Sequence, residues 1–134
     1  IKASFTAPSP SASGAKALAL GVPKPSLLAG FANSHVSRRS LPTVLPHAGR
    51  EHVTVNLTLP EGLRPLYVPP STDVENRAGS LHRSFRSHDK GLAFDWKTEI
   101  GGSVVTPDAY GDWKALFAAA QNPAGRTVVW SAKP

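Results

Sequence analysis

Two long segments alternate apolar and polar residues so regularly that they constrain the fold more than any other feature of this chain. In EHVTVNLTLPEG, residues 51–62, the alternation places an apolar set on one face: Val53, Val55, Leu57 and Leu59. In GLAFDWKTEI, residues 91–100, the corresponding set is Leu92, Phe94, Trp96, Thr98 and Ile100. A period of two is typical of a β-strand with one buried face. The sequence therefore predicts a mainly β protein in which these faces form the core.

The segment before the second of these strands predicts a hairpin that ends in a polar turn. SLHRSFRSH, residues 80–88, runs into Asp89-Lys90-Gly91, where the glycine can take a positive φ. The incoming strand has one face with Leu81, Arg83 and Phe85 and another with His82, Ser84 and Arg86. We expect Arg86 or His82 to pair with Asp95 or Glu99 on the returning strand. The many cations of HRSFRSHDKG are thus interpreted as a solvated strand face and a turn.

The first fifty residues are rich in loops but contain three candidate elements. IKASFTA, residues 1–7, alternates like a strand, and AKALALGV, residues 15–22, fits a short strand or one helical turn. SLLAGFANSH, residues 26–35, is compatible with a short helix capped by Ser26. Beyond this region, the prolines of residues 63–69 place that segment at a sheet edge. Two further short strands are expected to meet at Ala78-Gly79.

One helix is predicted at residues 106–121, with Thr106 as its N-cap, Pro107 in the first position and Asp108 near the positive end of its dipole. A stripe at helical spacing follows, made of Tyr110, Trp113, Leu116, Phe117 and Ala120. Residues 122–125, NPAG, end the helix, and a last strand is expected at residues 126–131. The expected fold is one antiparallel β-sandwich domain over residues 1–134, with a loop-rich entry at 1–50, a strand meander at 51–106 and one C-terminal α-helix before the last strand.

Length and composition limit what this domain can contain. A chain of 134 residues suits one domain with its own core, and 13 prolines and 11 glycines favour short strands and loops. The lack of cysteine excludes disulfides, thiolate nucleophiles and cysteine-ligated zinc. No apolar run approaches the roughly 20 residues of a membrane-spanning helix, so we expect no membrane span. The chain begins at Ile1 and has no methionine, which favours a piece of a longer protein.

The charge of the chain raises nucleic acid as a possible partner. A net charge of +6 and a pI near 10.1 are typical of proteins that bind anionic surfaces. The cations are scattered, however, and only Arg38 and Arg39 are adjacent, so a solvated basic surface is the favoured interpretation over nucleic-acid binding. The candidate residues for a surface interaction are Arg38, Arg39, Arg77, Arg83 and Arg86.

No pattern in the sequence predicts catalysis, a cofactor or a metal. The five histidines show no HxH or HxxxH spacing, no GxSxG elbow is present, and the glycines are too isolated to cradle a phosphate. Asp95 and Glu99 share a strand face with Lys97, which indicates an exposed charge ladder more than a hydrolytic pair. Four aromatic residues are candidates for a carbohydrate platform, but core packing explains them better: Trp96, Tyr110, Trp113 and Trp130.

The order of several motifs resembles a known family. The segments are HVTVNLTLPEGL, VENRAGSLHRSFRSHDKGLAFDWKTEI, TPDAYGDWKALFAAA and RTVVWSA. Together they are similar to the C-terminal β-sandwich of bacterial transglutaminase-like proteins that begin with a domain of unknown function. The matching positions are Leu59-Pro60-Glu61-Gly62, Asn76-Arg77-Ala78-Gly79, Tyr110, Trp113 and Phe117, whereas Leu63 stands where an aromatic residue is common. The resemblance covers residues 36–132, and IKASFTAP fits the family's opening strand.

The resemblance implies a role without catalysis. In that family the Cys-His-Asp constellation lies in a middle domain upstream of this region, and this chain has no cysteine to supply such a site. The implied role is a non-catalytic accessory domain that packs beside the upstream transglutaminase-like domain of the same polypeptide, in a periplasmic or secreted protein. Two alternatives from other classes remain: a carbohydrate- or peptide-binding module that uses exposed aromatic residues, and a basic domain that binds anions or nucleic acid through the five arginines.

Overall fold

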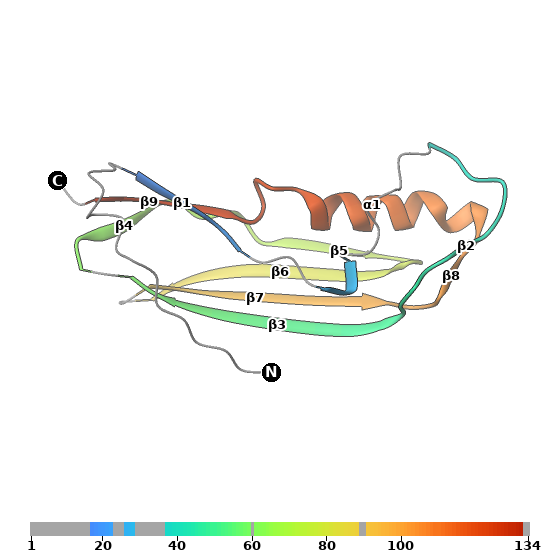
Figure 1. Cartoon of the computed structure of the whole chain (residues 1–134), viewed down its shortest axis with the longest axis horizontal. Helices are drawn as coiled ribbons and strands as arrows, with labels where there is room; N and C mark the ends of the chain where they lie inside the picture. The colour runs from blue at the N-terminus through green and yellow to red at the C-terminus, as the bar shows by residue number, and fades with distance from the viewer. Residues whose placement is uncertain (1–16, 23–25, 29–36, 60, 89–90, 133–134) are drawn as a thin grey trace.

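The computed structural model describes residues 17–22, 26–28, 37–59, 61–88 and 91–132 (Figure 1). The strand expected at residues 1–7, most of the helix expected at 26–35 and the hairpin tip at 89–90 lie outside these residues, although a 3-10 turn is present at Ser26–Leu28. The strands in chain order are β1 (Ala17–Gly21), β2 (Thr43–Val44), β3 (Gly49–Thr58), β4 (Leu63–Tyr67), β5 (Thr72–Asn76), β6 (Gly79–His88), β7 (Gly91–Ile100), β8 (Val104–Val105) and β9 (Thr127–Ala132). A 3-10 turn (Pro107–Ala109) leads into helix α1 (Tyr110–Gln121), which lies between β8 and β9.

The largest layer is a four-stranded antiparallel sheet with the order β3-β7-β6-β5. Its two longest pairings place Val53 opposite Trp96 and Phe85 opposite Phe94. The second is the pairing that a hairpin with a turn near residue 90 requires. Every predicted apolar position of β7 is buried, and those of β3 are half-buried on the same face. The alternating pattern is therefore confirmed, because one side of each strand forms core and the other side faces solvent.

The second layer changes from helix to sheet along the length of the molecule. Figure 1 shows α1 and the three-stranded sheet β1-β9-β4 on the same side of the four-stranded sheet, at opposite ends. The larger core cluster lies under the helix and contains Leu81, Phe94, Trp96, Ile100, Tyr110, Trp113 and Leu116. The smaller cluster lies under the three-stranded sheet and contains Leu92, Val128 and Trp130. The prediction of a mainly β, antiparallel fold with one helix before the last strand is confirmed.

Helix α1 begins later and is fixed differently from the prediction. Pro107 occupies the first turn as expected, but that turn is a 3-10 turn and the α-helix begins at Tyr110. Thr106 is the N-cap residue of this 3-10 turn, as predicted, but its side chain makes no capping hydrogen bond to the backbone. Arg77 instead holds the helix start: its Nε donates to Asp112 at 2.6 Å and its Nη1 to Asp108 at 3.1 Å. A cation from the β5–β6 turn thus binds the acidic first turns of the helix.

The turn between β5 and β6 explains the Asn-x-x-Gly motif. Asn76 Nδ2 donates to the backbone oxygen of Asp112, and Asn76 Oδ1 accepts from the amide of Ala78, so this side chain closes the turn and binds the helix. Gly79 has a φ of +147°, and a Cβ at this position would stand 1.9 Å from the backbone oxygen of Glu99 on β7. Only glycine allows the two strands to approach this closely in that conformation.

β4 does not belong to the four-stranded sheet. It is an edge strand of the three-stranded sheet, where it pairs with β9. Pro65 therefore lies at a sheet edge, as its residue type predicted. A separate two-stranded ribbon, β2-β8, pairs Val44 with Val104, and both side chains are exposed. Within the described part of the chain, no helix is long and apolar enough to cross a membrane.

Candidate functional site

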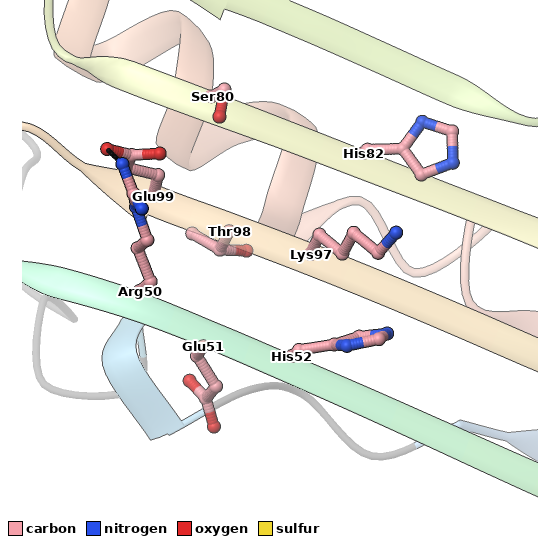
Figure 2. Close-up of a pocket in the computed structure, with 8 residues that line it drawn as sticks. All are labelled: Arg50, Glu51, His52, Ser80, His82, Lys97, Thr98 and Glu99. Atoms are coloured by element: carbon pink, nitrogen blue, oxygen red, sulfur yellow. Dashed lines mark hydrogen bonds and ion pairs between the residues drawn. The ribbon is translucent and has the colours of Figure 1, made fainter.

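The solvent-facing side of the four-stranded sheet holds the polar cluster that the sequence analysis singled out. We call it the outer sheet face. Its pocket is lined by Arg50, His52, Ser80, His82, Lys97 and Glu99, together with Glu51 and Thr98, which belong by strand alternation to the opposite face (Figure 2). Lys97 on β7 lies between His52 on β3 and His82 on β6, because both histidines are its register partners. Asp73 on β5 is in turn the partner of His82, so the row crosses all four strands. The strand period of two accounts for this gathering of nitrogen-bearing side chains on one face.

Each histidine of the row is tied to a carboxylate. His52 Nε2 lies 2.6 Å from Asp95 Oδ2, and His82 Nδ1 is hydrogen-bonded to Asp73 Oδ1. Asp95 also accepts a hydrogen bond from Thr54 Oγ1 at 3.1 Å, and Lys97 Nζ lies 3.9 Å from its other oxygen. Partial burial alone would raise the pKa of Asp95, but the hydrogen bonds from His52 and Thr54 outweigh burial and hold that pKa below its ordinary value.

At the adjacent row, Arg50 Nη2 donates to Glu99 Oε1 at 2.9 Å. This hydrogen bond raises the pKa of Arg50 above its ordinary value. The prediction that Arg86 or His82 pairs with Asp95 or Glu99 is wrong. β7 is a central strand, and its acids find their cations on β3, which is its other neighbour. The hairpin alone did not reveal that second partner.

The chemistry available on the outer sheet face is recognition through charge. The ion pairs Arg50–Glu99 and His82–Asp73 are solvent-exposed, and such pairs contribute little to stability. Among the described residues, no group of three or more His, Asp or Glu side chains is placed to hold a metal ion. The face presents basic and acidic groups in fixed register, which suits contact with a complementary charged surface.

The five arginines proposed as an interaction surface do not form one patch. Arg38 is exposed, and the neighbouring Arg39 guanidinium lies 5.5 Å from the ring centre of Tyr110. Arg77 is engaged with the start of α1, where the hydrogen bond to Asp112 raises its pKa. Arg86 is exposed on β6, on the outer sheet face. Arg39 and Arg77 both lie at the start of α1, whereas Arg86 lies on the outer sheet face.

Arg83 is not a surface residue, because only 2% of it is exposed. It belongs to the inner face of β6, between Leu81 and Phe85, and its guanidinium lies 5.3 Å from the Trp96 ring centre. Burial lowers the pKa of Arg83 from its ordinary value, and the nearby positive charge of Arg126 adds to this effect. The alternation already placed Arg83 on the apolar face, so the pattern contained this signal and the residue type obscured it.

The aromatic residues are confirmed as core. Trp96, Trp113, Trp130 and Tyr110 are each exposed by 3% or less, so none of them offers a platform for a sugar ring. Tyr67 on β4 is the exposed aromatic side chain of the described residues. Arg126, which the sequence analysis did not single out, proves to lie beside Arg83 at the junction between α1 and β9. No local pattern marks it, since this proximity arises from the packing of the two layers.

Comparison with known proteins places the fold. One solved structure, from Parabacteroides distasonis and described as a "putative protease", matches 86% of this chain with a TM-score of 0.71 and 24% sequence identity. The chain spans 23% of that protein's length, and at this identity the likeness concerns the fold. No curated protein matches. A family model described as a domain of unknown function with a solved structure matches residues 23–130, and the chain therefore belongs to this family, DUF3858.

Proposed function

We propose that this chain is a non-catalytic module of a larger protein and that it acts by packing against another domain of the same polypeptide. The observation that carries the proposal is the match of 86% of the chain to 23% of a much longer protein with a TM-score of 0.71. A fold that occurs as a small part of a longer chain is expected to meet its neighbours through a defined surface.

The proposed neighbour is a transglutaminase-like domain that precedes this module, as the motif resemblance implies. In this arrangement the neighbour supplies the cysteine nucleophile, because the present chain has none. The module helps to shape the neighbour's cleft, and the whole protein acts in the periplasm or outside the cell. The charges of the outer sheet face are paired with one another, which supports recognition more than acid–base catalysis on that face.

The test separates catalysis from docking. The chain and the domain encoded before it are produced as separate proteins, and their association is measured by isothermal titration calorimetry. Peptidase and acyl-transfer activities are then measured for each protein alone and for the mixture. We expect the two proteins to associate, this chain alone to be inactive, and the mixture to exceed the activity of the isolated neighbour. Turnover by this chain alone, or a lack of association, would overturn the proposal.

A further inference from the structure

Two arginines meet where the second layer changes from helix to sheet. Arg83 comes from the inner face of β6, and Arg126 precedes β9 in the loop that follows α1. Gly125 packs directly on the Arg83 guanidinium, since a Cβ on that glycine would stand 2.1 Å from Arg83 Nη2. The side chain of Arg126 is half-buried, whereas Arg83 lies fully inside. Arg126 is therefore the member of the pair that solvent can reach.

The hydrogen bonds of the pair leave Arg126 Nη2 without an acceptor among the described residues. Arg83 Nη2 donates to Thr72 Oγ1 at 2.9 Å and Nη1 to the oxygen of Ala119 at 3.4 Å, while its Nε has no acceptor. Arg126 Nη1 donates to the oxygen of Val22 at 3.2 Å, and its buried Nε also has no acceptor. With Nη1 engaged and Nε buried, Nη2 is the donor of Arg126 that remains for a carboxylate.

No counter-ion for this pair occurs among the residues that the structure describes. No described carboxylate comes within 4.0 Å of either guanidinium, and the charged or polar groups that act on Arg83 are Arg126 and Tyr67. The last turn of α1 offsets part of the charge through the Ala119 oxygen. Two adjacent buried cations still favour an anion beside them, because an unpaired buried charge is costly.

Two exposed apolar side chains lie near this position. Tyr67 is 43% exposed and Leu20 37%. Tyr67 donates from its hydroxyl to the oxygen of Ala124, two positions before Arg126. Leu20 lies two positions before Val22. The Val22 amide donates to the backbone oxygen of Arg126, and the Val22 oxygen accepts from Arg126 Nη1. One end of the three-stranded sheet thus combines apolar contact area with a cationic donor that lacks a partner.

We propose that Arg126, with Arg83 behind it, receives an acidic side chain of the domain against which this module packs, and that Leu20 and Tyr67 contact apolar residues around that acid. The inference rests on the proposed function, and it names the partner's chemistry: a carboxylate with apolar neighbours. The carboxylate accepts from Arg126 Nη2 and neutralises a pair of charges for which the described residues supply no acid.

The carboxylate site is tested on the chain alone with acetate as the probe. The Nε–H resonances of the arginines are followed by NMR while sodium acetate replaces sodium chloride at constant ionic strength. We expect the Arg126 resonance to shift and saturate with acetate, while that of Arg86 on the outer sheet face stays in place. Acetate should also raise the melting midpoint by a few degrees in the wild type and not in Arg126→Gln. An Arg126 resonance that does not respond to acetate would overturn the inference. An equal shift when sodium chloride alone is added would overturn it as well.

The docking role is tested with the separate neighbouring domain. Arg126→Gln should weaken association roughly thirtyfold or more, because it leaves the partner's acid buried and unpaired. Arg126→Lys, which keeps the charge but loses the planar guanidinium, is used instead if the glutamine variant does not fold. Arg86→Gln is the matched control. Association that is insensitive to Arg126 overturns this inference and leaves the proposed function standing. An acetate site in a chain that does not associate with its neighbour overturns the proposed function instead.

Discussion

A close approach of two strands gives a quantitative prediction at Gly79. An alanine there faces two separate penalties: a φ of +147° and a Cβ only 1.9 Å from the Glu99 oxygen. The conformation costs about 1–3 kcal/mol for a residue with a Cβ. Relieving the contact requires β6 and β7 to move apart locally, which weakens about two ladder hydrogen bonds at roughly 0.5–1.5 kcal/mol each. Gly79→Ala should therefore cost about 2–6 kcal/mol of unfolding free energy.

Two other glycines separate these penalties. Gly49 has a φ of +141° with nothing within 4 Å of its Cβ position, so Gly49→Ala should show the conformational cost alone. Gly91 has no positive φ, but its Cβ would stand 1.8 Å from the Leu57 oxygen, so Gly91→Ala should show the contact cost alone. The Gly79 variant should lose about the sum of the other two, since it combines both effects.

Urea denaturation followed by tryptophan fluorescence measures these differences, because all three tryptophans are buried in the native state. The transition midpoint should be lowest for Gly79→Ala. Equal losses for Gly79→Ala and Gly49→Ala would refute the reasoning, because they would show that the strands absorb the added carbon without cost. The slope of the transition should stay unchanged, which confirms that the variants share the native fold.

Three further predictions concern the ion pairs and the core. The pKa of Asp95 lies below its ordinary value of 3.8, so its ionised form stabilises the native state above that pH. This contribution is lost as the pH falls through the lowered pKa. Acid titration of Asp95→Asn should therefore show a smaller loss of stability below about pH 4 than titration of the wild type. Arg77→Ala should speed amide hydrogen exchange in the first turn of α1, whereas the control Arg64→Ala on β4 should not. Equal exchange rates in the two variants would contradict a stabilising role for the Arg77–Asp112 hydrogen bond. Iodide should quench the native tryptophan fluorescence weakly, and strong quenching would contradict the burial of Trp96, Trp113 and Trp130.

Local patterns predicted the parts of the fold that depend on neighbouring residues. The period of two located β3, β6 and β7 and the face that each buries, because alternation is a property of the strand itself. The spacing of Tyr110, Trp113 and Leu116 likewise identified the buried side of α1. Burial of Arg83 also followed from strand parity, although its charge made a surface position the natural expectation.

Strand order could not be read in this way. Sequence showed β7 beside β6 because a hairpin joins them, but β3 lies on its other side through contacts forty residues apart along the chain (Val53 with Trp96, for example). The partners of Asp95 and Glu99 depend on that order, and so the predicted ion pairs failed. The assignment of β1 and β4 to a second sheet with β9 has the same origin. Register between distant segments is decided by packing, which no local pattern contains.

The same dependence on packing explains why an arginine stands at the junction of the two cores. Leu81 belongs to the cluster under the helix, whereas Phe85 packs against both clusters, and Arg83 lies between them on β6. At this point α1 ends, and its last carbonyl groups need donors that an apolar side chain cannot provide. The Arg83 guanidinium meets that need at Ala119, but it brings a charge into the interior. A fold that ends a helix over a sheet here therefore acquires a buried cation, and Arg126 adds a second one that is half-buried. Because the module supplies no acid to this position within its described residues, the most economical completion of the structure is an acid from outside it.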